Sequence, residues 1–561
     1  MKGLSNPLLN LGFEFDMIEN CKRLVPLCPA FVMVATLLSS CGGDSGEGGG
    51  GQGQERGNAI SETTTGEEWA GKNSTREDDN TWYRHCFADD TSVASPSTRA
   101  ATPYGNEVIV KMRKSSGEMP DYSVMMEGGM HDRERLDRVV ERINRRHAVM
   151  LLHPLGSSAI GDGMSGDLLS VKRPMSGGAA VVEVSTAANS VAGVVEELTH
   201  EPEIEYAELN YKVQSSAIEQ PDVQHRDAWY LHNVDAGIRI DQAWRVTQGV
   251  PGAVTAVLDT GVTSHPNLVS HLLPGYNFVT DSFAENGSGR GSDVQDPGDW
   301  IGQDESGAFA QTVRNSSWHG TSVAGVVAAT MSMNGWEDRR QARILPVRVL
   351  GKGGGRTSDV VDGMRWAAGL PVVGVPENPH PAKVVNLSLG SVGACSRTFQ
   401  EAVDDLVEQG VTVVAAAGND GVNEIDAPAN CRGVISVTGS DPTGRRVSDS
   451  NTHPRVTLSA PGTKIWTLSN TGKQAPAEAS YGYMHGTSLA APQVSGVVSL
   501  MLATNPWLTP SEVASILKRT ARFTSIVSTT RSCRVIPPGR GILDAQAAVS
   551  AAAAERNSGG Q

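Results

Sequence analysis

The chain has 561 residues, 62 of them glycine, and a formal net charge of −15 at neutral pH. A length this far beyond one ordinary domain predicts two or more folded units with tails. The acidic balance repels phosphate backbones and anionic lipid headgroups, which argues against nucleic-acid binding and permanent attachment to a charged membrane surface.

The first segment, residues 1–41, has the pattern of an export signal. Lys22 and Arg23 precede an apolar run over residues 24–38, and two serines follow before Cys41. A positive start, a short apolar core and small residues at a cut are typical of a secretory signal, and the run is short for a membrane span. Its end resembles a bacterial lipobox, which predicts lipidation of Cys41 and a secreted or envelope-associated protein. A simple secretory signal without lipid is the alternative.

The next segment, residues 42–106, begins Gly-rich and stays polar, so we expect a flexible linker. Residues 107–213 have instead the pattern of a small α+β domain. Strand-like runs cover 107–112, 179–184 and 203–207, and helix-like apolar spacing covers 136–143 and 191–198.

The segment 214–226 is mostly polar and is expected to be a second linker, before a large domain over residues 227–550. That domain contains apolar runs rich in valine and isoleucine at 253–258, 344–350, 383–389, 411–416 and 434–438. Because helical stretches lie between several of them, we predict an α/β fold with a doubly wound, mostly parallel sheet. The tail, residues 551–561, is expected to be frayed.

Three motifs lie where apolar runs end or apolar helices begin. Asp259 opens Asp-Thr-Gly, His319 opens His-Gly-Thr-Ser-Val-Ala-Gly, and Ser488 lies in Gly-Thr-Ser-Leu-Ala-Ala-Pro. A hydroxyl is a poor nucleophile at neutral pH and needs a base, which needs an orienting group. We assign these roles to Ser488 as nucleophile, His319 as base and Asp259 as the residue that orients the imidazole.

A fourth motif supplies a group for the tetrahedral oxyanion. The run Val-Val-Ala-Ala-Ala-Gly-Asn ends at Asn419, whose amide can donate a hydrogen bond together with the Ser488 backbone N–H.

These four motifs, in this order, closely resemble those of the subtilases, over about residues 227–549. The resemblance implies a subtilisin-like fold and a serine endopeptidase that needs no catalytic cofactor and acts as a monomer on protein or peptide substrates. It also implies substrate contacts from Gly353, Gly354, Gly355, Ser388, Leu389, Gly390, Ala417 and Gly418. An extended substrate pairs with such edges as an added strand.

Residues 107–213 resemble the inhibitor-like propeptide of that family. The resemblance implies that this segment assists folding, blocks the cleft and is cut off by the enzyme itself, within residues 213–224. If Cys41 is lipidated, that cut releases the enzyme from a transient membrane anchor.

Many subtilases bind structural calcium, and one loop of this chain has hard-cation ligands. Asp293, Asp296 and Asp299 form an acidic loop that could hold the ion, and a solvated acidic loop is the alternative.

Two cysteines, Cys395 and Cys431, flank Asn419 in sequence, and we predict a disulfide between them because the compartment is oxidising. The alternative is that they are buried thiols.

Other functions are weaker interpretations of the same residues. Asp-Thr-Gly also marks aspartic proteases, which need two carboxylates sharing a proton, and no partner motif lies in a foldable segment. A binding protein or chaperone on an inactive protease fold is a second alternative, and a structural surface lipoprotein a third.

Overall fold

The computed structural model describes residues 101–114, 124–152, 167–186, 188, 190–215, 218–220, 228–247, 253–280, 289–303, 305, 312–332, 342–523 and 539–558. All of these belong to the second of two units into which the chain divides, residues 77–561. The expected signal, Cys41 and most of the expected first linker lie outside the described residues. So do positions 216–217 and 221–224 of the expected self-cleavage range.

The first folded part of this unit is an antiparallel sheet with two helices, which we call the N-terminal subdomain. Its strands are β1 (Pro103–Met112), β2 (Leu169–Pro174), β3 (Ala179–Val184) and β4 (Ile204–Ser215), in the order β4-β1-β3-β2. Its helices are α2 (Val124–Leu152), α3 (Val191–His200) and the short η2 (Ser176–Gly178). Leu136, Val139 and Ile143 of α2 are buried against the sheet, which is the spacing expected from the sequence.

The larger part is built on a seven-stranded parallel sheet in the order β14-β13-β12-β10-β6-β8-β7. Its strands are β6 (Val254–Asp259), β7 (Tyr276–Asn277), β8 (Arg343–Arg348), β10 (Val384–Leu387), β12 (Thr412–Ala416), β13 (Val434–Ser440) and β14 (Leu458–Pro461). The five strands predicted from apolar runs are β6, β8, β10, β12 and β13.

Helices cover both faces of this sheet. They are α4 (Trp229–His232), α5 (Ile240–Val246), α7 (His319–Met331), α8 (Thr357–Ala367), α9 (Arg397–Glu408), α10 (Thr487–Thr504), α11 (Pro510–Thr520), α12 (Ala545–Ser558) and the short η3 (Val269–His271). Neighbouring strand residues separate between two cores: Val385 and Val413 pack with α8 and α9, whereas Val384 and Val414 pack with α10. This two-residue alternation is what a strand buried on both faces requires.

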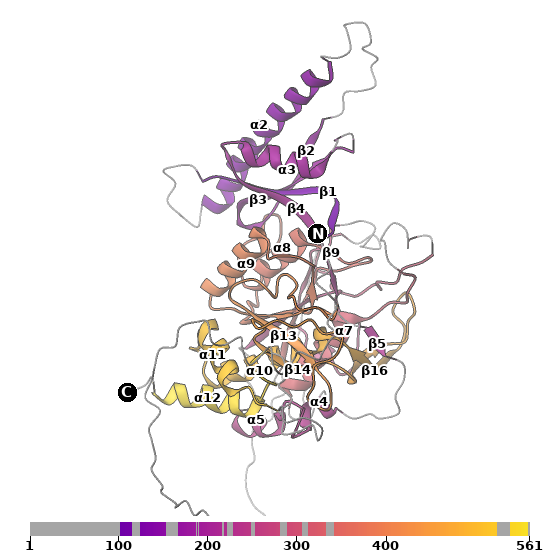
Figure 1. Ribbon diagram of the computed structural model, residues 1–561, viewed down its shortest axis with the longest axis vertical. Helices are drawn as coiled ribbons and strands as arrows, with labels where there is room; N and C mark the ends of the chain where they lie inside the picture. Colours follow the sequence, from indigo (N-terminus) through magenta and orange to yellow (C-terminus); the bar gives the residue numbers. More distant parts are fainter. Residues whose placement is uncertain are drawn as a thin grey trace, which may run out of the picture. The chain divides into compact units, whose positions relative to one another are not determined.

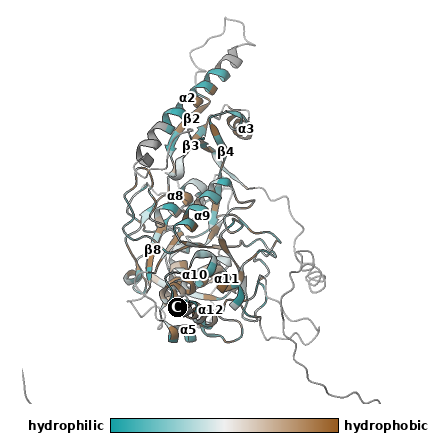
Figure 2. Cartoon of the chain, turned by 90° about the vertical axis from the view of Figure 1, so that its left-hand side faces the viewer, coloured by the Kyte–Doolittle hydropathy of each residue, from teal (hydrophilic) through white to brown (hydrophobic). Residues whose placement is uncertain are grey.

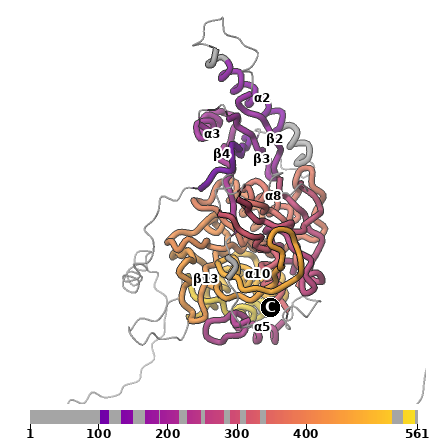
Figure 3. The backbone as a smooth tube through the Cα atoms, turned by 90° about the vertical axis from the view of Figure 1, so that its right-hand side faces the viewer, coloured from indigo at the N-terminus to yellow at the C-terminus, as the bar shows by residue number. Residues whose placement is uncertain are grey.

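Figures 1 and 3 both place α8 between the N-terminal subdomain and the parallel sheet, and residues of all three share one buried cluster. Figure 2 shows hydrophobic residues in β8, which is largely buried, and hydrophilic residues along α2. Among the described helices, only α10 is long and apolar enough to cross a membrane. Because 89% of that stretch is buried in the protein, it is a core helix.

A three-stranded sheet and two short strands complete the fold around the motifs. β15 (Ile465–Asn470), β16 (Ala479–His485) and β5 (Ile218–Gln220) form an antiparallel sheet in that order. The short strands β9 (Gly355–Arg356) and β11 (Leu389–Gly390) both pair with β4.

The predicted α/β class with a doubly wound, mostly parallel sheet is confirmed, but three boundaries differ from the expected ones. β1 begins at Pro103, inside the expected linker, and β5 lies inside the second linker. α12 continues to Ser558, where the tail was expected to be frayed. Residues 103–106 and 218–220 are largely polar sequence that pairs with neighbouring strands, so their own composition gave little sign of structure. The four alanines at 551–554, by contrast, favour a helix by their own propensity.

The predicted disulfide is confirmed: Cys395 and Cys431 are bonded, with their Cα atoms 5.1 Å apart. The two cysteines are 36 positions apart in the sequence. Cross-linking a loop of that length lowers the entropy of the unfolded chain. We expect a C395S/C431S double variant to lose about 3–4 kcal/mol of unfolding free energy. Urea titration should show this loss, and wild type unfolded with reductant should match the variant; equal midpoints for oxidised wild type and variant would contradict it.

Candidate active site

The three residues of the predicted triad lie at element ends on one edge of the parallel sheet. Asp259 is the last residue of β6, His319 is the first of α7, and Ser488 is the second of α10. All three are buried. Because open α/β sheets form their sites beyond the carboxyl ends of the strands, this is the expected place for chemistry.

The carboxylate and imidazole are in direct contact. His319 Nδ1 lies 2.7 Å from Asp259 Oδ1, which also accepts a hydrogen bond from the Thr260 backbone N–H at 2.8 Å. Because the carboxylate accepts, the proton sits on Nδ1 and Nε2 presents a lone pair. Nε2 makes no hydrogen bond within the described part of the chain, so it is available as a base.

Two opposing effects set the basicity of His319. Burial lowers the pKa of its imidazole, but the charge and hydrogen bond of Asp259 raise it, helped by the carboxylates of Asp299 and Asp296. The net result is a pKa above the ordinary value for histidine. A buried imidazole that is stabilised in its protonated form is suited to accept a proton during reaction.

Ser488 points to a backbone carbonyl in this state. Its Oγ donates a hydrogen bond to the Ser388 carbonyl oxygen at 2.9 Å, and Ser388 Oγ donates to the Ser488 carbonyl at 2.8 Å. His319 Nε2 accepts no hydrogen bond from Ser488 in this state. Such contacts often form fully only with substrate bound.

The predicted oxyanion donors also come together. Asn419 Oδ1 accepts a hydrogen bond from the Thr487 backbone N–H at 2.9 Å, which fixes the orientation of the planar amide. The NH₂ group of the Asn419 amide is therefore left as a hydrogen-bond donor beside the start of α10. The first backbone N–H groups of an 18-residue helix add partial positive charge at the same place.

The Asp259 turn and the start of α7 approach so closely that only glycine fits at residue 320. A Cβ there would lie 2.0 Å from the Gly261 carbonyl oxygen and 3.2 Å from the Asp259 Cβ. Thr260 Oγ1 accepts a hydrogen bond from the Gly320 N–H at 3.0 Å, so the two segments are also bonded.

We therefore expect Gly320→Ala to push Asp259 and His319 apart. Overpacking should cost about 1–3 kcal/mol of unfolding free energy, and a displacement of about 1 Å should lower kcat/KM about 100-fold. Gly291→Ala is the matched control, because a Cβ there has open space around it. Equal activity and stability of the two variants would show that the contact is not needed.

The two predicted cleft edges are occupied by β4 of the N-terminal subdomain. The backbone pairs are Lys212 with Arg356, Val213 with Gly355, Gln214 with Gly390 and Ser215 with Leu389. The predicted contact residues Gly355, Leu389 and Gly390 thus do bind an extended strand. Ser388, the residue before this edge, lies beside Ser488.

The neighbouring glycines explain why these edges carry small residues. Gly354 has a φ of +111°, and a Cβ there would lie 2.3 Å from the Val213 carbonyl oxygen. Gly353 also has a positive φ, of +73°. On the other side, the Ala417 N–H donates to the Val437 carbonyl, and the Gly418 N–H donates to Thr487 Oγ1. Ala417 and Gly418 thus hold the Asn419 turn against β13 and α10. The strand β4 does not pair with either residue.

The acidic loop is not assembled as a metal site. No group of three or more His, Cys, Asp or Glu side chains is placed to hold a metal ion within the described ranges. The oxygens of the loop accept hydrogen bonds from protein groups instead: Asp293 from the Gln295 N–H, Asp296 from Thr260 and the Gly298 N–H, and Asp299 from Arg314 and Ser317. Burial and the charge of Asp299 raise the pKa of Asp296 to about 7. The expected calcium ligands therefore do not fit calcium here, because their oxygens are already engaged.

Two features of the site were missed from the sequence. Asp296 accepts a hydrogen bond from Thr260 Oγ1 at 2.6 Å, and so links the loop to the turn after Asp259. His485, directly before the Gly-Thr-Ser motif, is 2.6 Å from Asp449. The sequence position of His485 gave a signal, since it precedes the nucleophile by three residues, but nothing indicated its partner 36 positions away.

Comparison with known proteins places this geometry in a family. The family model described as the subtilase family matches residues 251–551, more than half of the chain. The chain belongs to the subtilase family. The resemblance predicted from the four motifs is thus confirmed. The order Asp, His, Ser along the chain of this subtilase is the one expected for the family.

Curated relatives of this subtilase include two named as extracellular proteases. An extracellular protease of Xanthomonas campestris pv. campestris is 39% identical over 363 residues, covering 64% of this chain and 61% of the relative. An extracellular basic protease of Dichelobacter nodosus is 37% identical over 376 residues, covering 65% and 61%. The chain thus spans about three fifths of the length of these relatives.

Solved structures agree on the fold. A protease from Pseudoalteromonas arctica is 41% identical with a TM-score of 0.54, covering 59% of this subtilase and 98% of that chain. Fervidolysin from Fervidobacterium pennivorans has the same TM-score at 20% identity, covering 81% and 62%. At that identity the second likeness shows the fold alone.

Proposed function

We propose that this subtilase is an exported serine endopeptidase that cleaves peptide bonds through an acyl-enzyme on Ser488. The observation that carries the proposal is the 2.7 Å contact of His319 with Asp259 on the same sheet edge as Ser488. The curated relatives named as extracellular proteases support the reaction class and export.

The reaction proceeds in two balanced steps. Ser488 Oγ attacks the scissile carbonyl carbon while His319 Nε2 takes the hydroxyl proton, and the carbonyl oxygen becomes an oxyanion that Asn419 and the Ser488 N–H stabilise. Collapse of this intermediate breaks the C–N bond, and His319 returns the proton to the leaving amine. A water, deprotonated by His319, then hydrolyses the ester and releases Ser488.

The same proposal includes a self-inhibited precursor. The N-terminal subdomain would be the propeptide, because its last strand, β4, fills the cleft between β9 and β11 in the manner of a substrate. Pairing on one side ends at Ser215, and β5 resumes pairing with β16 at Ile218, opposite His485. We therefore propose that self-cleavage falls between residues 215 and 218.

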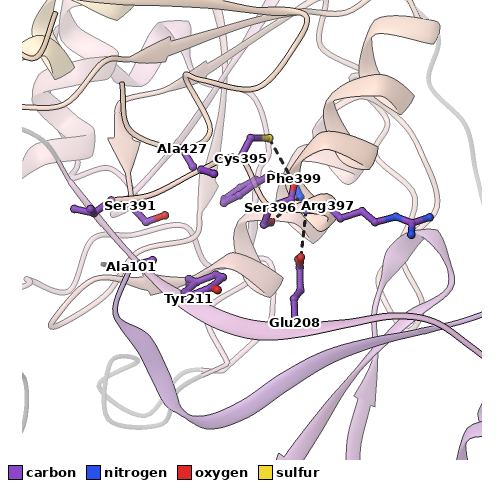
Figure 4. A pocket seen from close by; sticks show the side chains of 11 residues that line it. Ala101, Glu208, Tyr211, Ser391, Cys395, Ser396, Arg397, Phe399 and Ala427 are labelled. Atoms are coloured by element: carbon purple, nitrogen blue, oxygen red, sulfur yellow. Dashed lines mark hydrogen bonds between the residues drawn. The ribbon is translucent and has the colours of Figure 1, made fainter. Parts of the chain in front are cut away.

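Charged contacts hold the subdomain on the larger part. Glu208 of β4 accepts hydrogen bonds from the backbone N–H groups of Arg397 and Thr398, at 3.2 and 3.1 Å. Figure 4 shows the carboxylate of Glu208 directed at the start of α9, in a pocket that both parts line. A carboxylate at a helix N-terminus is favourable because the helix dipole is positive there.

A buried pair of carboxylates adds to this attachment. Arg173 of β2 reaches Asp359 at 2.7 Å and Asp362 at 2.8 Å, and Arg290 contacts both carboxylates from the other side. Burial would raise the pKa of Asp362, but Arg173 and Arg290 hold it below its usual value. Asp362 is therefore ionised at neutral pH and keeps its ion pairs, which favours a subdomain that stays bound as an inhibitor.

We expect the processed enzyme to begin at Ser216, Ala217 or Ile218. These starts correspond to cleavage of one of the three peptide bonds between Ser215, where pairing with β11 ends, and Ile218, where pairing with β16 begins. Intact mass and N-terminal sequencing of the secreted protein measure it directly. A processed N-terminus before Val213 or after Gln220 would rule out cleavage in the observed strand arrangement.

Export and anchoring complete the proposal. We propose that the precursor is lipidated at Cys41 and that self-cleavage releases the enzyme from the membrane. Metabolic labelling with a fatty acid should mark the wild-type precursor in the membrane fraction and leave Cys41→Ala unlabelled. Equal labelling of both proteins would contradict lipidation at Cys41 and would leave the proposed peptidase function unaffected.

A further inference from the structure

The strand that leads to the nucleophile carries a hydrogen-bonded histidine–aspartate pair with no role in the steps above. His485 is the last residue of β16. Its Nε2 lies 2.6 Å from Oδ2 of Asp449, and the two side chains are 15% and 34% exposed. The cationic side chain of Arg446 also acts on Asp449.

Each side chain of this pair has one polar atom for which the described residues supply no hydrogen-bond partner. His485 Nδ1 and Asp449 Oδ1 are both buried and make no hydrogen bond within the described part of the protein. When Nε2–H donates to Asp449, the neutral imidazole carries a lone pair on Nδ1, and an ionised carboxylate oxygen only accepts. Two acceptors thus lack a donor, which is rare for buried polar atoms.

The pair lies beside the path of the leaving half of a substrate. β5 follows the cleavage interval and pairs with β16, with residue 218 directly opposite His485. Residues directly opposite in antiparallel strands present their side chains on the same face. A substrate that takes the place of β5 therefore presents one side chain next to His485 and Asp449. The chain's own residue at that position is isoleucine, which has no donor to offer.

We propose that His485 and Asp449 form a specificity subsite on the leaving-group side of the cleft, which selects a lysine or arginine opposite His485. This rests on the proposed endopeptidase function and names a substrate feature for it. A cationic donor satisfies both acceptors and neutralises the carboxylate. In its own precursor the enzyme meets isoleucine there, so that sequence is a poorer substrate than a basic one.

The test uses two peptides with the chain's own sequence over residues 210–222, one with the native isoleucine at position 218 and one with lysine there. Processed wild-type enzyme should cleave the lysine peptide about tenfold better in kcat/KM, the size expected for a hydrogen bond to a charged group. His485→Ala and Asp449→Asn should each bring the ratio close to one. His232→Ala is the matched control, since His232 also pairs with an aspartate, Asp241, at 3.0 Å, and should keep the wild-type ratio. Mass spectrometry of the products confirms that the same bond is cut.

A ratio near one in the wild type, or a ratio that persists in both variants, would overturn the subsite. Equal losses for both peptides in the variants would also overturn it, because the pair would then only support the Asn419 turn. A wild type that cleaves neither peptide, and no protein substrate, contradicts the peptidase function itself.

Discussion

Replacing Ser488 with alanine should abolish peptidase activity and leave the precursor uncut. The expected fall in kcat is about 10⁶-fold, which is the loss measured when the nucleophile of a subtilisin is removed. The reason is structural: Ser488 is the second residue of α10, directly after Thr487, whose backbone N–H donates a hydrogen bond to Asn419. Expression of the variant followed by intact mass measures both effects at once.

A serine on the same helix serves as the control. Ser499 of α10 is buried and hydrogen-bonded to Thr255 at 2.6 Å, so Ser499→Ala should cost about 1 kcal/mol of stability and still yield processed enzyme. If Ser488→Ala were processed at the wild-type rate in the absence of other protease, Ser488 would not be the nucleophile.

Replacing Asp259 with asparagine should lower kcat about 10⁴-fold, as removal of a triad carboxylate does elsewhere. An amide in place of the carboxylate can stabilise the wrong imidazole tautomer and no longer offsets the charge on His319. The structure adds a pH signature to this loss. In wild type the pKa of His319 is above its ordinary value: burial lowers it, and the charge of Asp259 outweighs the burial.

Because the base must be neutral, wild-type kcat/KM should fall as the pH drops through this raised pKa. Without the Asp259 charge, burial is left with much weaker opposition, from Asp299 and Asp296 alone, so the pKa of His319 falls. The acid limb of the residual activity should therefore move to lower pH in Asp259→Asn. A limb that stays in place, or moves to higher pH, would mean that Asp259 does not set the protonation of His319.

The parts of the site that could be predicted from sequence are those with short, ordered motifs. Asp259, His319 and Ser488 each lie at a strand or helix end, and Asn419 lies three residues after β12, so continuous apolar runs mark their positions. A parallel strand buried on both faces is visible as such a run. The cysteine pairing was also predictable, because export and the position of both residues around Asn419 pointed to it.

Other parts depended on contacts that no local pattern encodes. The pairing of β5 with β16 arises only when the cleft orders a polar linker. The acidic loop was interpreted from its charges, but its oxygens turn inward to Thr260, Arg314 and Ser317. Charge spacing in sequence does not show whether carboxylates face a common point. For the same reason the pairing of His485 with Asp449 was not foreseen, although His485 directly precedes the motif.

Covalent labelling of the processed enzyme with a fluorophosphonate tests the central claim most directly. The reagent requires a serine activated by a nearby base, so peptide mass spectrometry should find one adduct, on Ser488, with activity lost in proportion to labelling. The precursor form of Ser488→Ala should take up no label. An adduct on another residue that tracks the loss of activity, or full activity with Ser488 labelled, would contradict the account.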